Sequence, residues 1–260
     1  DSTGDWSSDV CSSDLAVAAS TPATENDPKA DDQPFSSDSD EASLTSTEGE
    51  PICEGDTIII TDLLPSKEEA GIFERVKTEV QWQKMSHQGG EVPRLVAVQG
   101  EIGKDGSIPI YRHPADESPP LLEFSPVITV IRREVEKKLG HPVNHCLIQL
   151  YRSGTDYISE HSDKTLDIVP DTYIANVSLG AQRTMTFRTK RVLKDGKQLQ
   201  TEEGNPRSTC KAVLPHNSLC RMGLMTNMRW LHSIRQDKRL DRDKSPEELD
   251  YSGKIGRAHV

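Results

Sequence analysis

The most informative stretch of the chain is residues 144–164, which read NHCLIQLYRSGTDYISEHSDK. The stretch contains two runs of β-type residues, and the second run ends in His161-Ser162-Asp163. Residues two positions apart on an extended segment project to the same side, so His161 and Asp163 can bind one metal ion. An HxD tripeptide alone is a weak signal, because many proteins without a metal contain one. A third ligand must therefore come from elsewhere in the chain.

His232 is the candidate third ligand, in the later β-type run NMRWLHSIRQDKR. Two imidazoles and one carboxylate on one face of a metal leave three positions open, the arrangement of non-heme iron(II) oxygenases. The alternative is that His161 and His232 are structural or surface histidines, and the residues alone leave it open. Five other histidines are weaker candidates for a metal ligand, because they are predicted to lie in loops, in a turn or inside a strand: His87, His113, His141, His145 and His216.

The acidity of the chain belongs to its first part. The formal net charge is −11, yet residues 1–50 contain thirteen Asp and Glu against Lys29 alone, so the remainder sums to about +1. Residues 16–54 are rich in Ser, Thr, Asp and Glu and poor in large apolar residues, which predicts a disordered acidic tail or linker. Residues 55–253 are long enough for one substantial core.

Cellular location is inferred from signals that the chain does not contain. The sequence has no apolar run long enough to cross a membrane and no secretory signal, so we expect an intracellular protein, in the nucleus and/or the cytoplasm, with no membrane partner. We also expect a monomer. The five cysteines have neither CxxC nor zinc-type spacing, which favours thiols in a reducing compartment.

Both ends of the chain look foreign to it. Asp5–Leu15 (DWSSDVCSSDL) and Ile255–Val260 (IGRAHV) resemble frame translations of a short-read sequencing adapter and of its reverse complement. We therefore interpret residues 1–15 and 254–260 as adapter-derived. Resequencing the transcript tests this interpretation, since native codons in place of the adapter would support it.

Two helices are predicted before the β-type runs. Ser66 as N-cap with Glu69 as a capping box, followed by an apolar stripe, predicts a helix to about Lys84. Ser125, Pro126 and Gly140 mark the start and the stop of a second helix. Short strands at close spacing come after it. This order indicates an α+β protein in which helices support an antiparallel sandwich or barrel.

Four segments of the chain are similar to one known family. The segments NHCLIQLYRSGTDYISEHSDK, IANVSLGAQRTMTFRTK, NMRWLHSIRQDKR and EVPRLVAVQG resemble the AlkB family of Fe(II)/2-oxoglutarate dioxygenases, in its eukaryotic nucleic-acid demethylase branch. The resemblance implies an α+β fold whose core is a double-stranded β-helix (jelly roll) with supporting N-terminal helices. It implies Fe(II), 2-oxoglutarate and O2 as cofactors.

The resemblance also assigns residues. His161, Asp163 and His232 match the iron ligands and hence the catalytic centre. Tyr151 matches a tyrosine that contacts 2-oxoglutarate, and Gln149 stands where the family usually has an asparagine near that cosubstrate. On the substrate side, Arg94 lies in the segment that borders the base. Two further candidates come from residue type and position and not from the resemblance: Tyr111 to stack on the base and Arg188 to contact phosphate.

Two departures from the family affect these assignments. The family closes its site with a strand bearing RxxxxxR, and the chain meets the adapter-like segment where that strand should begin, so residues 55–253 are expected to lack the last strand and Arg257 is no substitute. In addition, Lys164 and Thr165 follow the HxD where the family commonly has an acid, which leaves the preferred base open.

The implied function is oxidative demethylation of N-alkylated bases in DNA or RNA, in the repair of alkylation damage, on a single strand or a flipped base. The alternatives are a hydroxylase of a protein or lipid substrate and a catalytically weakened binding module. Trp82 and Tyr111 are candidates to stack on the base, with core packing as the alternative for both. The expected phosphate contacts lie on the strand after the HxD: Arg183, Arg188, Lys190 and Arg191.

Loss of the arginine pair leads to a measurable expectation for this chain. Removing a buried charge-assisted partner costs about 2 to 5 kcal/mol, so we predict that the protein binds iron but binds 2-oxoglutarate weakly and turns over poorly. Titration of 2-oxoglutarate into the iron-loaded protein measures this, and a micromolar dissociation constant would contradict it.

Overall fold

Long buried strands form the framework of the protein. The computed structural model describes residues 44–45, 49–87, 90–109, 119–166, 168–191, 193–194, 197–198, 207–246, 249 and 255–259. Tyr111 lies outside the described residues, as do the adapter-like segment at the start and most of the acidic tail. Apart from residues 44–45, the described structure therefore begins at Gly49.

One sheet has five strands in the order β1-β13-β10-β15-β8. Its strands are β1 (Leu44–Thr45), β8 (Ile158–His161), β10 (Arg183–Thr189), β13 (Thr209–Leu214) and β15 (Trp230–Ile234). All neighbours pair antiparallel except β1 and β13, which pair parallel.

The other large sheet has seven strands in the order β2-β14-β9-β16-β7-β5-β6. Its strands are β2 (Ile58–Ile60), β5 (Leu95–Gly100), β6 (Leu121–Glu123), β7 (His145–Tyr151), β9 (Tyr173–Gly180), β14 (Ser218–Gly223) and β16 (Ile255–His259). Two small ribbons, β3 (Ser86–His87) with β4 (Gly90–Glu91) and β11 (Leu193–Lys194) with β12 (Lys197–Gln198), stand apart from both sheets.

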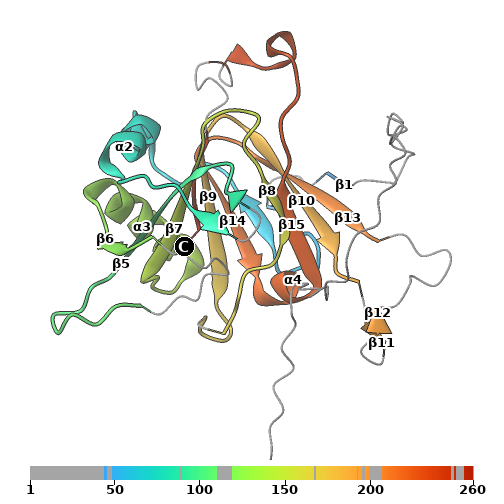
Figure 1. Cartoon of the computed structure of the whole chain (residues 1–260), viewed down its shortest axis with the longest axis horizontal. Coiled ribbons are helices and arrows are strands. Elements are labelled where there is room, and N and C mark those ends of the chain that lie inside the picture. Colours follow the sequence, from blue (N-terminus) through green and yellow to red (C-terminus); the bar gives the residue numbers. More distant parts are fainter. Residues whose placement is uncertain are drawn as a thin grey trace, which may run out of the picture. The chain divides into compact units, whose positions relative to one another are not determined.

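Helices cover one face of the seven-stranded sheet. The helices α2 (Ile72–Glu79) and α3 (Pro126–Leu139) pack apolar side chains against every second residue of β7, namely Cys146, Ile148 and Leu150. In Figure 1 these helices lie beside β5, β6 and β7. The intervening residues of β7 must face the opposite way, and Tyr151 indeed joins a second core with Phe187 of the five-stranded sheet.

This second core lies between the two sheets. It combines Ile174 and Met222 of the seven-stranded sheet with Met185, Leu214 and Ile234 of the five-stranded one. The result is a mixed α+β architecture with helices on one sheet face and a sheet-on-sheet core behind it. Among the described residues no backbone ladder joins the two sheets.

The first predicted helix is wrong in its extent. Where one helix to about Lys84 was predicted, the chain forms two short helices, α1 (Ser66–Glu69) and α2, which ends at Glu79. Gly71 lies between them in the left-handed conformation at φ +69°. Helical hydrogen bonding cannot continue through that backbone geometry. The predicted capping box is also wrong, because Pro65 occupies the N-cap position and no side chain caps the helix.

The second predicted helix is confirmed. It runs over Pro126–Leu139 with Ser125 at the N-cap position, and Gly140 ends it in the left-handed conformation at φ +78°. The β-type runs after it contain strands as predicted, but Asn227–Arg229 of the run NMRWLHSIRQDKR are helical. One helix was not predicted, α4 (Leu224–Arg229), which follows β14 directly and precedes β15.

The structure bears on membrane-spanning helices and on the state of the cysteines. Across the described residues, no helix combines the length and apolarity needed to span a bilayer. The four described cysteines, Cys53, Cys146, Cys210 and Cys220, form no disulfide with one another.

Packing of α3 on the sheet predicts a specific loss of stability. Ile131 is 1% exposed in the helix-sheet core, so Ile131→Ala should lower the free energy of unfolding by about 2–5 kcal/mol. Lys138→Ala on the exposed side of the same helix should change it by less than about 0.5 kcal/mol. Urea unfolding followed by circular dichroism measures both, and equal effects would contradict the assigned face.

Candidate metal centre

The two histidines of the predicted site face each other across neighbouring strands. His161 of β8 and His232 of β15 are direct partners in the antiparallel ladder. Their ring centroids lie 4.2 Å apart, and the ring of Phe187 lies 6.2 Å from that of His232. His232 is 1% exposed, so its imidazole sits at the edge of the core between the sheets.

A β-bulge aims His161 at its partner. Ile158 pairs with Ile234 and His161 pairs with His232, so two residues of β8, Ser159 and Glu160, lie opposite Ser233 alone. In a regular strand, residues three positions apart point to opposite faces. The extra residue brings Ile158 and His161 onto the same face, as bulges next to functional sites commonly do.

Asp163 completes the group from beyond the end of β8. Its Oδ1 lies 3.9 Å from His161 Nε2, and its Oδ2 lies 3.6 Å from His232 Nε2. One ligand atom from each residue lies within 4.8 Å of the others. Both side chains of the HxD were predicted to lie on one extended segment, but the strand ends at His161 and Asp163 belongs to the loop after it.

The residues fit a metal ion. The Oδ2 atom of Asp163 is buried and accepts no hydrogen bond from the described part of the chain, which is unfavourable for a carboxylate unless a cation satisfies it. Two ligand atoms on one ion, at bond lengths of about 2.0–2.2 Å, lie at most about 4.4 Å apart. The two contacts of Asp163, at 3.9 Å with His161 and 3.6 Å with His232, are within that range.

The ring of His161 is oriented by its own strand. His161 Nδ1 lies 2.8 Å from the carbonyl oxygen of Ser159, inside the bulge. A carbonyl accepts a hydrogen bond, so this contact places a proton on Nδ1, and in the neutral ring Nε2, 3.9 Å from Asp163 Oδ1, is the atom with the lone pair that binds a metal.

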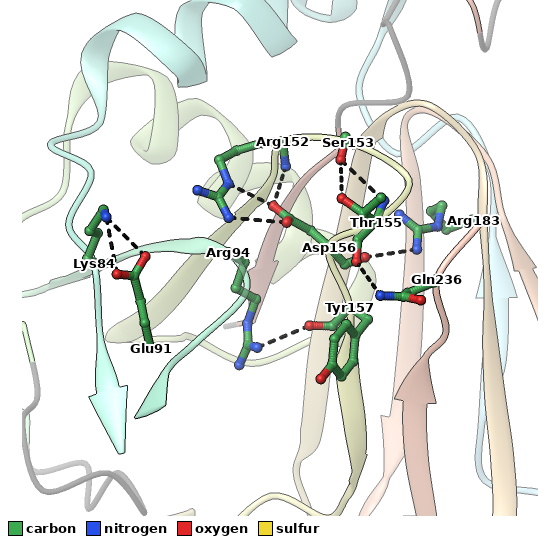
Figure 2. Close-up of polar contacts among 10 residues, drawn as sticks. All are labelled: Lys84, Glu91, Arg94, Arg152, Ser153, Thr155, Asp156, Tyr157, Arg183 and Gln236. Atoms are coloured by element: carbon green, nitrogen blue, oxygen red, sulfur yellow. Dashed lines mark hydrogen bonds and ion pairs between the residues drawn. The ribbon is translucent and has the colours of Figure 1, made fainter. Parts of the chain in front are cut away.

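Hydrogen bonds fix the segment Arg152–Tyr157, which connects β7 to β8 (Figure 2). Arg152 donates to Asp156 through Nε at 2.9 Å and Nη2 at 3.2 Å, and this bonding raises the pKa of Arg152 above its usual value. Arg183 Nη2 donates to the Asp156 carbonyl at 3.2 Å, and Gln236 Nε2 donates to the Thr155 carbonyl at 2.9 Å. Several elements thus determine where β8 begins.

The predicted cosubstrate residues lie on the face of β7 that looks toward the other sheet. Tyr151 is fully buried and Gln149 is 1% exposed. Tyr151 donates to Gln149 Oε1 at 3.5 Å, and the guanidinium of Arg183 lies 5.8 Å from the centre of the Tyr151 ring. Polar groups of this kind inside a sheet-on-sheet core are expected where a ligand binds.

Arg94 lies next to this pair. It is 8% exposed, and its Nε donates to Gln149 Oε1. Its Nη1 donates to the Tyr157 carbonyl at 3.2 Å (Figure 2). Arg94 was predicted to border the substrate base. In the structure it is hydrogen-bonded to Gln149, a predicted cosubstrate residue. Its role in substrate binding stays a prediction.

Sequence reasoning missed the polar residues of β9. Asn176 and Ser178 are buried, and Ser178 stands in one cross-strand row with Gln149, on the other side of residue 257 of β16. Residues in such a row share a face of the sheet. The alternation of IANVSLG, with polar residues at every second position, was the available signal.

The strand β16 falls on residues interpreted as adapter-derived. It pairs antiparallel with both β7 and β9. Ladder hydrogen bonds are made by the main chain, so this pairing carries no information about the origin of the residues. The domain boundaries, and the expected weakness toward 2-oxoglutarate, stay predictions.

The predicted substrate contacts differ in their exposure and in the groups that they bind. Arg188 is partly exposed on β10, and its Nη1 lies 3.2 Å from Glu160 Oε1, so a carboxylate next to His161 already holds it. Arg183 is 5% exposed and its guanidinium donates to backbone carbonyls, so its prediction as a phosphate contact is wrong. Trp82 donates to the Lys77 carbonyl and packs on the helix side, which supports the core alternative.

Comparison with known proteins agrees with this geometry. A family profile described as the 2OG-Fe(II) oxygenase superfamily matches residues 56–254. DNA oxidative demethylase ALKBH2 of Mus musculus is 35% identical over 118 residues, which cover 44% of this chain and 46% of that protein. Alpha-ketoglutarate-dependent dioxygenase alkB homolog 3 of Bos taurus is 27% identical over 172 residues, which cover 65% of this chain and 56% of that protein.

The chain belongs to the 2OG-Fe(II) oxygenase superfamily, and its relatives make it an AlkB-like member. The predicted resemblance is therefore confirmed, and family membership implies Fe(II) and 2-oxoglutarate as cofactors, with His161, Asp163 and His232 as the candidate triad. The chain spans about half the length of the curated relatives it matches.

Removal of any one ligand should abolish tight metal binding. We expect His161→Ala, Asp163→Ala and His232→Ala each to weaken Mn²⁺ binding by more than about 100-fold, because even outer-shell changes at metal sites cost about 10–100-fold. Calorimetric titration of the metal-free protein measures this. His141→Ala, which removes a histidine stacked on Tyr173, is the control and should retain the affinity.

Proposed function

We propose that this protein catalyses Fe(II)/2-oxoglutarate-dependent oxidative demethylation of N-alkylated bases in DNA or RNA. The observation that carries the proposal is the convergence of His161, Asp163 and His232 in a chain whose relatives include DNA oxidative demethylases. The finer fold assignment belongs to the same proposal, namely that the two facing sheets are the halves of a double-stranded β-helix.

The proposed roles follow from the placement of the side chains. His161, Asp163 and His232 would hold the ferrous ion on one face, and Tyr151 and Gln149 would contact 2-oxoglutarate from β7 of the facing sheet. When bound, the ion with its cosubstrate supplies an oxidation by O2. Overall, the methylated base, 2-oxoglutarate and O2 yield the unmethylated base, formaldehyde, succinate and CO2.

The protein groups position the reactants and exclude water from them. The His232 side is closed by Phe187 and the apolar core between the sheets, so the substrate must approach from the His161 side, where β8 is at the sheet edge and more exposed. A base inside a duplex cannot present its methyl group there. The proposed substrate is therefore a single strand or a flipped nucleotide.

Arg188 is the proposed phosphate contact. On β10 it follows Phe187, which lies opposite His232, so its side chain is on the outer face of the five-stranded sheet, away from the metal group. Glu160, the ionic partner of Arg188, directly precedes His161. Arg207 reaches the same carboxylate, with Nη1 3.8 Å from Glu160 Oε2. A nucleic-acid phosphate would compete with Glu160 for these cations. An intracellular location, in the nucleus and/or the cytoplasm, is part of this proposal.

Direct assay of product tests the function. We expect formaldehyde and succinate in equal amounts from oligonucleotides that contain 1-methyladenine or 3-methylcytosine, and none with the His232→Ala variant. Mass gain on peptides or hydroxylation of lipids without formaldehyde release would instead indicate a hydroxylase. Absence of all turnover, with oligonucleotide binding retained, would indicate a binding module and contradict the proposal.

The role of Arg188 is tested by a pair of substitutions. Arg188→Ala should weaken single-stranded oligonucleotide binding and reduce the slope of log K against log salt by about one. Glu160→Gln should strengthen binding, because it removes the competing carboxylate and leaves the arginine in place. Fluorescence anisotropy over a salt series measures both. Arg133→Ala, on the exposed side of α3, is the control, and an identical loss there would count against Arg188.

A further inference from the structure

Asp163 differs from the other two candidate ligands in how its backbone is held. His161 and His232 belong to paired strands, and ladder hydrogen bonds fix their backbones. Asp163 comes after the last residue of β8, in a segment without regular secondary structure. Some other group must fix its conformation if its carboxylate is to meet both histidines.

The amide of Asn227 takes the place of a neighbouring strand. Its Oδ1 accepts a hydrogen bond from the N–H of Asp163 at 2.9 Å, and its Nδ2 donates to the carbonyl of Asp163 at 2.9 Å. Both polar groups of the Asp163 backbone are thus bound by one side chain that is 64 positions away in sequence. Asn227 is 2% exposed, so water does not compete with these bonds.

The helix that carries Asn227 is itself braced at its start. The carboxylate of Asp56 accepts from the backbone N–H of Met225 at 3.0 Å and of Thr226 at 3.2 Å, and it also binds the Thr226 hydroxyl. The hydroxyl of Thr57 accepts from the N–H of Gly223 at 3.2 Å. The turn before β2 therefore fixes where α4 begins.

Further contacts fix the end of α4. Glu54 accepts from Trp230 Nε1 at 2.9 Å and pairs with Arg229 Nη1 at 2.7 Å. Lys190 Nζ donates to the backbone carbonyl of Asn227 at 3.1 Å. The side chain of Asn227 is held on a short helix that is fixed at both ends, so it is preorganised to bind Asp163.

We propose that Asn227 is a positioning residue for the metal centre: it holds the backbone of Asp163 so that the carboxylate points at the same ion as His161 and His232. The inference rests on the proposed function, because it assumes a metal at these three residues. Without the clamp, Asp163 would sample other conformations, and each bound ion would have to reorder it.

A second asparagine of this protein supplies a matched control. Asn217 is 1% exposed and clamps Leu64 in the same way, with Leu64 N–H donating to Oδ1 at 2.9 Å and Nδ2 donating to the Leu64 carbonyl at 3.0 Å. Leu64 belongs to the helix-sheet core and not to the metal group. The φ of Asn217 is +57°, so alanine there is also strained and should destabilise the fold at least as much.

The test compares metal affinity in Asn227→Ala and Asn217→Ala. Mn²⁺ is titrated into each metal-free protein, and the free ion is followed by electron paramagnetic resonance. We expect Asn227→Ala to bind Mn²⁺ about 10–100-fold more weakly than the wild-type chain. Asn217→Ala should keep the wild-type affinity while losing folding stability in urea. Asn227→Leu, which preserves more packing volume, should behave as Asn227→Ala and serves if the alanine variant does not fold.

The outcomes separate the clamp from the metal centre. Wild-type affinity in a folded Asn227 variant would overturn the positioning role and leave the centre intact. Equal weakening in the Asn217 and Asn227 variants would overturn it too, because the effect would then be general destabilisation. A wild-type chain without affinity for Mn²⁺ or for anaerobic Fe²⁺ would overturn the proposed metal centre itself, and the role of Asn227 with it.

Discussion

The site depends on the register between β8 and β15. A shift of one residue in either strand would turn a histidine to the other face of the sheet, and the bulge at Ser159 and Glu160 is what sets the phase on the β8 side. On its other edge β15 pairs with β10, where Phe187 lies opposite His232. Because β15 lies between β10 and β8 in the five-stranded sheet, it links the core between the sheets to the metal group.

The three candidate ligands are held by different kinds of structure. Sheet hydrogen bonds hold the histidines, whereas a side-chain amide on a braced helix holds Asp163. Loops open locally at lower free energy than strands do, so Asp163 is the ligand whose order depends most on its surroundings. The polar residues Gln149 and Ser178 on the inner sheet face place hydrogen-bonding groups between otherwise apolar layers. Gln149 accepts from Arg94 and Tyr151, whereas the buried Ser178 hydroxyl has no hydrogen-bond partner among the described residues.

Local sequence signals predicted elements whose ends are set locally. Pro126 and Gly140 marked the ends of α3 correctly. A proline in the first turn and a left-handed glycine after the last turn start and stop a helix through their own backbone conformation. The same approach failed at Gly71, because the helix predicted from Ser66 included a residue whose left-handed conformation breaks it. It failed again for α4, whose residues LMTNMR carry no local start signal, since the group that caps it, Asp56, lies 169 positions away from Met225.

The ligand set His161, Asp163 and His232 could be identified from sequence, because the HxD spacing and the AlkB-like segments around it specify residue types independently of their distance in space. Only the tertiary structure decided how these side chains meet. The bulge in β8, the amide clamp from Asn227 and the capture of Arg188 by Glu160 all join residues far apart in the chain or change the phase of a strand. Such contacts form when sheets and helices pack, and no local pattern of residues encodes them.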